Sequence, residues 1–363
     1  MAKALIAMSG GVDSSVSALL TIEKGYECIG CTMRLFDGAT DDESAGIEQS
    51  AEAAESTCCS LSDVEDARSV AYKLGMKYYV FNFTRDFREQ VILPFVNCYL
   101  KGQTPNPCIE CNKHLKFDRL YQRGRELGYD YIVTGHYARI TRDGELYQLR
   151  KAMNAAKDQS YVLYGMTQDQ LAHTMFPLGE LDKERAREIA LANGFVNANK
   201  KDSQDICFVP DGDYARVVER ESGAKAKPGN FVDLSGAVLG QHKGIIHYTI
   251  GQRKGLGISS TEPYFVVSIH PEKNEVVLGR NEDLFGTRLT AMDVNWISGI
   301  IPEGDIRVSA RIRYHAPEKA ATLRFTDASH FELVFDEPQR AITPGQAVVV
   351  YDDDIVLGGG VIC

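Results

Sequence analysis

The sequence predicts an α/β protein with an N-terminal parallel sheet covered by helices on both faces, a small central domain and a C-terminal β-barrel. Up to about residue 200, short apolar runs alternate with segments of helical periodicity, which is typical of right-handed βαβ crossovers. From Tyr264 onward, short alternating runs are separated by turn residues, which is typical of a small barrel. Residues 211–257 are rich in glycine and polar side chains, and the segment YTIGQRKGLG from Tyr248 is expected to be a loop that carries Arg253 and Lys254. We therefore expect three domains, over residues 1–205, 206–270 and 271–363.

Each element of the N-terminal part follows from its local pattern. Strands are expected where apolar and β-branched residues form short runs bounded by glycine or polar residues. Helices are expected where apolar residues recur three and four positions apart, and Gly75 ends one of them. The expected strands are 4–8, 27–33, 77–83 and 131–134, and the expected helices are 12–20, 64–74, 84–100, 112–127 and 183–193.

The composition is that of a soluble globular protein. The 363 residues are 44% hydrophobic and 25% charged, and no apolar run approaches the roughly 20 residues of a membrane span. The N-terminal apolar run is also too short for a signal peptide, so we expect a cytoplasmic protein with no membrane partner. The nine cysteines are not evenly spaced, which favours thiols in a reducing compartment over a disulfide framework.

Charge is segregated along the chain. The net charge of −10 argues against non-specific binding of nucleic acid, which needs clustered lysine and arginine. Residues 37–48 are acidic, whereas residues 113–125 carry five basic side chains against one acid, Asp118. That basic segment is either a solvated helix face or a local surface for phosphates.

The heptad SGGVDSS, residues 9–15, joins the first expected strand to the first expected helix. Gly10 and Gly11 have no Cβ, so the backbone can turn sharply and an anion can approach it. The first amides of the helix have no partner within it, and serine hydroxyls add further donors, so the turn suits a phosphate. The lysine of the Walker pattern is absent, which indicates a different nucleotide chemistry. The alternative is a plain tight turn in which Asp13 or Ser14 caps the helix.

Two cysteine pairs have CxxC spacing and differ in context. Cys28 and Cys31 lie on an expected strand, where residues three apart point to opposite faces, so both are expected to be core thiols. Cys108 and Cys111 follow two prolines and precede the helix expected from residue 112. A thiol at a helix N-terminus beside basic side chains has a lowered pKa, so Cys111 is a candidate nucleophile. A structural zinc site would need further ligands, which the sequence lacks at zinc spacing.

Cys207 lies in the segment KKDSQDICFVP, residues 200–210. On its own, the ICF run would make this residue a core thiol. The charged flank from Lys200 to Asp205 instead favours an exposed loop, in which a thiol is open to chemistry.

Six motifs follow one another along the chain. They are SGGVDSS at 9–15, PNPCIECNKHLKF at 105–117, TGHYAR at 134–139, KDQSYVLY at 157–164, KDSQDICF at 201–208 and YTIGQRKGLG at 248–257. This series resembles the tRNA-specific 2-thiouridylase family, which belongs to the PP-loop ATP pyrophosphatases. With TPGQ at 343–346 the resemblance spans nearly the whole chain.

The resemblance implies roles for particular residues. Cys111 matches the family's catalytic nucleophile, and Cys207 matches the residue that carries a persulfide. The implied ATP contacts are Ala7, Met8, Ser9, Gly10, Gly11, Val12, Asp13, Ser14, Met33 and Gly135. The implied contacts to the target base are Asn106, Pro107 and Cys108, and the implied tRNA contacts are His136, Lys157, Asp158, Gln159, Arg313, Tyr314 and Gln346.

The resemblance also implies a reaction. A tRNA-uridine 2-sulfurtransferase adenylates the C2 oxygen of the wobble uridine, U34, and replaces it by sulfur to give 2-thiouridine, with AMP and pyrophosphate as products. ATP and magnesium are the expected cofactors, because the loop offers hydrogen-bond donors but little positive charge. The expected partners are tRNAs of the Lys, Glu and Gln type and a cysteine desulfurase or sulfur-relay protein as sulfur donor. Release of the sulfur is expected to join Cys111 and Cys207 in a disulfide bond.

Three alternatives stay open at this point. A PP-loop synthetase acting on a small molecule would need neither Cys111 nor a barrel, and a non-catalytic redox or metal-binding protein would release no pyrophosphate. An iron–sulfur-dependent tRNA thiolase would hold a [4Fe–4S] cluster on Cys108, Cys111 and Cys207. Many members of the family have aspartate where this chain has Cys108, and we favour the persulfide route over the cluster.

Overall fold

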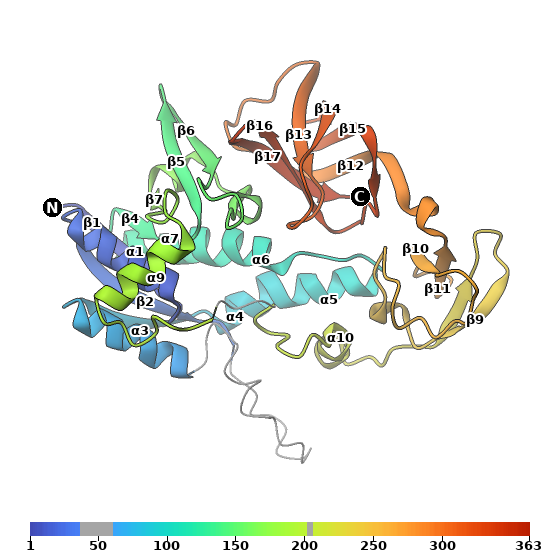
Figure 1. The fold of residues 1–363 in the computed structure, drawn as a ribbon, viewed down its shortest axis with the longest axis horizontal. Coiled ribbons are helices and arrows are strands. Elements are labelled where there is room, and N and C mark those ends of the chain that lie inside the picture. Colours follow the sequence, from blue (N-terminus) through green and yellow to red (C-terminus); the bar gives the residue numbers. More distant parts are fainter. Residues whose placement is uncertain (37–60, 202–205) are drawn as a thin grey trace, which may run out of the picture.

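The computed structural model describes residues 1–36, 61–201 and 206–363 (Figure 1). The acidic residues 37–48 and the middle of the Cys207 motif, residues 202–205, lie outside the described residues. The described part forms an N-terminal parallel sheet with helices, a smaller central sheet and a C-terminal barrel, so the predicted fold class is confirmed. Within the same ranges, no helix is long and apolar enough to cross a membrane.

The N-terminal sheet has five parallel strands in the order β3-β2-β1-β4-β7. The strands are β1 (Lys3–Ala7), β2 (Glu27–Arg34), β3 (Lys77–Asn82), β4 (Tyr131–Val133) and β7 (Thr174–Met175). The three middle residues of β1 are buried, as expected for a strand covered on both faces. The strand order reverses between β1 and β4, and ligands of such sheets bind outside the carboxyl ends of the strands at that point.

Helices cover both faces of this sheet (Figure 1). On one face, the apolar sides of α1, α3 and α9 form a single core with β1 and β4. On the other face, Leu120 of α7 is fully buried against Leu5, Ile29 and Ile132. These helices are α1 (Val12–Glu23), α3 (Leu61–Lys73), α7 (Leu120–Glu126) and α9 (Lys183–Ala192).

The connection from β3 to β4 is a run of helical segments, two of them π-helical. They are α4 (Thr84–Phe87), η1 (Arg88–Ile92), α5 (Leu93–Leu100), α6 (Pro107–Glu110), η2 (Cys111–Arg119) and α7. The helix expected from residue 112 begins at Pro107, so the expected start is wrong. The side chain of Asn106 accepts a hydrogen bond from the Cys108 amide at 3.1 Å, and proline suits the first helical position.

The central region holds a four-stranded sheet in the order β10-β11-β8-β9. Its elements are α10 (Tyr214–Ser222), β8 (Gly229–Val232), β9 (Val238–His242), η4 (Ile245–His247), β10 (Phe265–His270) and β11 (Glu275–Gly279). Residues 248–257 contain no helix or strand, so the loop expected there is confirmed. Helix α10 begins where Asp213 accepts a hydrogen bond from the Arg216 amide at 3.1 Å, and it ends at Gly223, whose φ of 68° suits glycine.

Six antiparallel strands form the C-terminal barrel in the order β12-β15-β14-β13-β16-β17, and β17 closes it by pairing with β12. The barrel follows a short 3₁₀ helix, η5. These elements are η5 (Asn281–Leu284), β12 (Phe285–Trp296), β13 (Asp305–Arg311), β14 (Lys319–Asp327), β15 (His330–Arg340), β16 (Ala347–Asp352) and β17 (Ile355–Ile362).

A hairpin from the N-terminal region continues the sheet of the barrel. The hairpin and the segments that follow it are β5 (Ala138–Asp143), β6 (Leu146–Lys151), η3 (Ser160–Leu163) and α8 (Gln168–Ala172). Strand β6 pairs with β17, and Arg139 and Arg150 of the hairpin contact Asp354 of the barrel at 2.6 and 2.7 Å. The barrel is thus joined to the N-terminal region through a shared sheet (Figure 1).

Candidate active site

The SGGVDSS segment, called the PP-loop below, follows β1 at the carboxyl edge of the sheet. Gly10 has a φ of +75°, and a Cβ there would lie 2.3 Å from the carbonyl oxygen of Asp63, so only glycine fits. The hydroxyls of Ser14 and Ser15 each donate to the carbonyl oxygen of Gly11 at 3.0 Å. The loop is thereby folded against the first turn of α1, whose outward amides suit a phosphate.

A segment after α9 holds the PP-loop from a second side. The side-chain amide of Asn197 donates to the Gly10 carbonyl oxygen at 2.8 Å and to the Ser15 hydroxyl at 2.9 Å. Asn197 is buried, and Lys200 nearby contacts the carboxylates of Asp63 and Asp66 at 2.6 Å each. No sequence motif marks Asn197 as a contact of the loop, because its partners lie far away in the chain.

Lys183, the first residue of α9, is the buried partner of Asp13 in the PP-loop. Its Nζ contacts both carboxylate oxygens of Asp13 at 2.8 Å, and the Tyr137 hydroxyl donates to the same carboxylate at 2.9 Å. Only 5% of the Lys183 side chain is exposed. The sequence pattern does not indicate this lysine, because a charged residue at the start of an amphipathic helix is usually solvated.

The chain after β4 passes close to the PP-loop. A Cβ on Gly135 would lie 2.8 Å from the Ser14 amide nitrogen, so a glycine is needed at this approach. His136 is buried, and its Nδ1 lies 2.7 Å from the Thr134 hydroxyl. Burial, together with the charge of Lys116, holds the pKa of His136 well below 6.5, so the imidazole is neutral at pH 7.

Cys108 and Cys111 lie on successive turns of the helix that begins at Pro107. Cys108 is exposed in the first turn, whereas Cys111 is half-buried at the start of η2. The helix dipole acts mainly within the first turn, which holds Cys108 and not Cys111. The expectation that Cys111 occupies the helix N-terminus is therefore wrong, because the helix starts earlier than the prolines indicated.

Cys207 lies beside an aromatic side chain that is buried in an apolar cluster. The ring of Phe208 packs against those of Phe87 and Phe95, with centroids 5.7 and 5.2 Å away. Cys111 and Cys207 both pack against this same cluster, and both are thiols in the structure. The two expected catalytic cysteines therefore border the same apolar cluster.

The second CxxC pair is part of the core, as expected. Cys28 and Cys31 lie on β2, and Cys31 is completely buried. Burial raises the pKa of Cys28 to about 11 and raises the pKa of Cys31 as well. Both thiols are therefore protonated and unreactive at pH 7.

Several residues with an implied tRNA role are engaged inside the protein near β5. Asp158 is buried, and its carboxylate accepts hydrogen bonds from two backbone amides at 3.1 and 3.2 Å. The Gln159 side chain accepts a hydrogen bond from the Tyr137 amide at 2.9 Å. The Tyr314 hydroxyl reaches the Asp158 carbonyl oxygen at 3.5 Å, and Lys157 is half-buried beside this group.

Arg313 and Gln346 join separate regions of the fold. Arg313 donates to the carbonyl oxygen of Ala341 at 2.8 Å and to the hydroxyl of Thr343 at 2.7 Å, and it also reaches the central region at Ile250. Gln346 donates to the carbonyl oxygen of Thr104 at 2.8 Å, directly before the PNPC segment. The barrel therefore contacts the segment that carries Asn106, Pro107 and Cys108.

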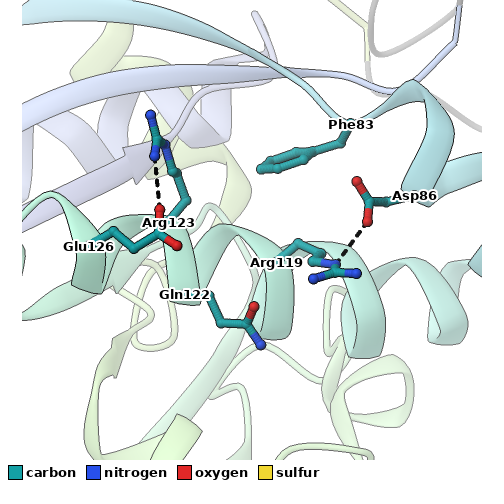
Figure 2. A pocket seen from close by; sticks show the side chains of 6 residues that line it. All are labelled: Phe83, Asp86, Arg119, Gln122, Arg123 and Glu126. Atoms are coloured by element: carbon teal, nitrogen blue, oxygen red, sulfur yellow. Dashed lines mark hydrogen bonds and ion pairs between the residues drawn. The ribbon is translucent and has the colours of Figure 1, made fainter.

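The basic segment 113–125 does not form one continuous surface. Figure 2 shows Arg119 directed at Asp86 and Arg123 at Glu126, in ion pairs of 2.8 Å each. These side chains line a pocket of about 260 Å³ between the helix and the residues after β3, which also includes Phe83 and Gln122. Because both signs of charge line the pocket, it has no preference for an anion.

The described residues offer different ligands for the two metal groups considered above, the [4Fe–4S] cluster and the magnesium ion. Across residues 1–36, 61–201 and 206–363, no group of three or more His, Cys, Asp or Glu side chains is placed to hold a metal ion. Cys108, Cys111 and Cys207 therefore do not form a cluster site in this structure. Magnesium needs only one or two carboxylates besides substrate phosphates, and Asp13, which also binds Lys183 and Tyr137, supplies one carboxylate at the PP-loop.

A phosphate-binding loop after the first strand, at the point where a parallel sheet reverses its order, defines a nucleotide-binding α/β enzyme. Family models agree with this class and cover the chain in three parts. They are the tRNA methyl transferase HUP domain at residues 2–211, the tRNA methyl transferase PRC-barrel domain at 217–280 and the aminomethyltransferase β-barrel domain at 286–362.

Relatives match over the full length. The tRNA-specific 2-thiouridylase MnmA of Clostridioides difficile (strain 630) is 52% identical over 362 residues, which cover 99% of this chain and 98% of that protein. The protein of the same name from Lachnoclostridium phytofermentans is 50% identical over 363 residues, which cover 100% of this chain and 99% of that protein. This chain belongs to the tRNA-specific 2-thiouridylase family and is an enzyme of it, so the resemblance of its motifs is confirmed.

Proposed function

We propose that the enzyme replaces the C2 oxygen of the wobble uridine U34 by sulfur in tRNAs of the Lys, Glu and Gln type, at the expense of ATP. The observation that carries this proposal is that Cys111, at the start of η2, and Cys207 pack against the same apolar cluster. An ATP loop alone is compatible with many substrates. An ATP loop together with two thiols is what the replacement of an activated oxygen by sulfur needs.

The first proposed step is adenylation. The C2 oxygen of uridine attacks the α-phosphorus of ATP, the new P–O bond forms, and the bond to pyrophosphate breaks. The PP-loop amides and serine hydroxyls bind the leaving pyrophosphate, and Gly135 lets the chain after β4 approach the nucleotide. Asp13 would hold the magnesium ion with the phosphates, and that ion would neutralise their charge.

The second proposed step moves sulfur. A cysteine desulfurase or sulfur-relay protein loads Cys207 as a persulfide, whose terminal sulfur attacks C2 of the adenylate and expels AMP. The Cys111 thiolate then attacks the Cys207 sulfur, so that the S–S bond of the persulfide breaks and a Cys111–Cys207 disulfide forms. A cellular dithiol must reduce this disulfide before the next turnover.

We assign the remaining contacts from the matched motifs. Residues Ala7 to Ser14, with Met33 and Gly135, bind ATP, and Asn106 to Cys108 receive the target base. The base must leave its stack to reach this segment. The buried positions of His136 and Asp158 support a role in shaping the tRNA-binding surface, with Lys157, Gln159, Arg313, Tyr314 and Gln346 around them.

The deciding experiment is mass analysis of nucleosides from tRNA incubated with enzyme, ATP, a cysteine desulfurase and cysteine. The expected result is 2-thiouridine at the wobble position together with AMP and pyrophosphate. ATP turnover that does not depend on tRNA would indicate a small-molecule synthetase, and ADP with inorganic phosphate would contradict the PP-loop chemistry. A methylated uridine would favour the methyl transfer named in the family models.

A cysteine variant distinguishes the persulfide route from a cluster. Cys108→Ser is expected to keep most thiolation activity in metal-free protein, because the persulfide route uses only Cys111 and Cys207. Loss of activity in anaerobically prepared Cys108→Ser, together with loss of iron–sulfur absorbance, would instead support the [4Fe–4S] enzyme.

A further inference from the structure

Lys116 lies on the side of its helix that faces the sheet. Leu120, four residues later, is fully buried against the sheet residues Leu5 and Ile132. Residues four apart share a helix face, so Lys116 lies on the same face one turn nearer the helix start. Because α7 ends shortly before β4 begins, the helix runs opposite to the strands, and its start lies at their carboxyl ends. Lys116 is therefore directed toward the edge that carries the PP-loop.

No carboxylate of the residues that the structure describes forms an ion pair with Lys116. Its side chain is nevertheless half-buried. The neighbouring basic residues differ: Arg119 is paired with Asp86 and Arg123 with Glu126 (Figure 2). The charge of Lys116 helps to lower the pKa of buried His136, so Lys116 lies near that residue. The neighbouring Gly135 touches the PP-loop, which agrees with a position of Lys116 near the loop. A half-buried cation without a counter-charge is an attractive site for an anion.

The PP-loop itself offers no such cation. Lys183 contacts the loop, but its ammonium group is bonded to both carboxylate oxygens of Asp13. The other groups of the loop are neutral amides and hydroxyls. Adenylation nevertheless concentrates negative charge on the phosphoryl oxygens while pyrophosphate leaves, and a nearby cation lowers the energy of that state.

We propose that the ammonium group of Lys116 binds a phosphate oxygen at this edge of the sheet during the reaction, and that Lys116 is a catalytic residue. This inference rests on the proposed function. The phosphate is either the α-phosphate of ATP or a phosphodiester of the tRNA next to the target base. Both are anions of the same chemistry, and the kinetics of a charge-removing variant separate them.

The test compares Lys116→Met and Lys116→Arg with Arg123→Gln, a control on the same helix whose side chain is paired with Glu126. AMP formation is measured at saturating tRNA and ATP, ATP binding by calorimetry, and tRNA binding by filter retention over a range of salt concentrations. The wild-type protein must first form AMP with tRNA. If it does not, the proposed function fails independently of Lys116.

An α-phosphate contact predicts that Lys116→Met lowers kcat for AMP formation about 100-fold or more, with little change in KM for ATP or in the melting temperature. Lys116→Arg should regain at least about a tenth of the rate, because the charge is restored. A phosphodiester contact predicts weaker tRNA binding, with a salt slope reduced by about one, and a nearly normal kcat at saturation. The proposal would be overturned if Lys116→Met had the same rate of AMP formation and the same affinities for ATP and tRNA as Arg123→Gln. It would also be overturned if Lys116→Arg folded but was as inactive as Lys116→Met.

Discussion

The PP-loop and the sulfur-transfer cysteines are held in place by different forces. The PP-loop is fixed by directional polar contacts from distant parts of the chain, including Lys183 on Asp13 and Asn197 on the Gly10 carbonyl. The cysteines share an apolar cluster into which Phe208 inserts its ring. Hydrogen bonds specify the position of individual atoms, whereas apolar packing is non-directional and specifies a neighbourhood.

This difference matches what each part must do. A loop that binds the same phosphates in every cycle gains from donors that are already in place before the ligand arrives. A cysteine that receives sulfur from one molecule and passes it to another must present its thiol to successive partners. The polar half of the site is the PP-loop, and the apolar half is the cluster that carries the cysteines. The two halves should therefore fail in different ways when single contacts are removed.

The largest effect is expected for Cys207→Ser. This variant should lose thiolation by more than about 1,000-fold, since no persulfide forms, while tRNA-dependent AMP formation continues. Cys111→Ser should also lose turnover but retain a persulfide on Cys207, which mass spectrometry of the protein detects. Cys363→Ser, which removes an exposed thiol at the chain end, is the matched control and should behave as wild type. Loss of AMP formation in Cys207→Ser would contradict the separation of the two halves.

Lys183→Met should damage the polar half. It leaves the Asp13 carboxylate without its cation, which is expected to cost about 3 kcal/mol in the free energy of unfolding. The displaced loop should lower kcat/KM for ATP about 100-fold. Urea unfolding and AMP formation measure these effects, with Arg185→Met on the exposed side of the same helix as control.

A double variant tests the cause of this loss. Asp13→Asn combined with Lys183→Met removes the buried charge, so stability should recover while activity stays low. Equal stability of the single and double variants would argue against the ion pair as the source of the effect.

Asn197→Ala should have a smaller effect of the same kind. It removes two hydrogen bonds and leaves the Gly10 carbonyl and the Ser15 hydroxyl with fewer partners, at a cost of about 2 kcal/mol. The KM for ATP should rise about fivefold while kcat at saturation changes little, as for an altered binding site. Asn199→Ala, at an exposed position two residues later, is the control. A fall in kcat alone would indicate that Asn197 acts on the chemical step.

The smallest effect concerns pH. Burial holds the pKa of His136 well below 6.5, so below pH 6.5 the unfolded chain binds a proton that the folded protein does not. Stability contributed by the neutral ring is therefore present above pH 6.5 and is lost as the pH falls, by up to about 1.4 kcal/mol per pH unit. Urea unfolding between pH 7 and pH 5.5 should show a smaller loss for His136→Asn than for wild type. An identical loss in both proteins would mean that His136 does not titrate differently on unfolding.

The sequence predicted the parts of this structure that depend on local patterns. The strand before Gly10, the helix after it and the barrel strands follow from periodicity and turn residues, and they were found. The helix at Pro107 was predicted to start too late, because proline was taken as a helix breaker although it also suits a first helical position. No helix or strand was predicted within residues 211–247, because glycines and polar residues obscure the patterns of α10, β8 and β9.

The contacts that complete the site could not be predicted from local patterns. Lys183 and Asp13 are separated by 170 positions, and nothing in the helix pattern of α9 distinguishes a buried lysine from a solvated one. The same is true of Asn197, whose partners are a backbone carbonyl and a hydroxyl in another element. Such pairs are created by the tertiary fold. The motif indicates where a ligand binds, but the residues that hold the motif in place become known only from the fold.

The hairpin of β5 and β6 has a consequence for dividing this enzyme into pieces. Strand β6 lies beside β17, and Lys151 of the hairpin also contacts Glu318 of the barrel at 2.7 Å. A fragment truncated before the barrel would expose the edge of β6 and leave Arg139 and Arg150 without the Asp354 carboxylate. Open strand edges recruit other strands, so such a fragment is expected to aggregate. The N-terminal region is thus a poor candidate for expression on its own, even though its sheet and PP-loop lie entirely within the first 200 residues.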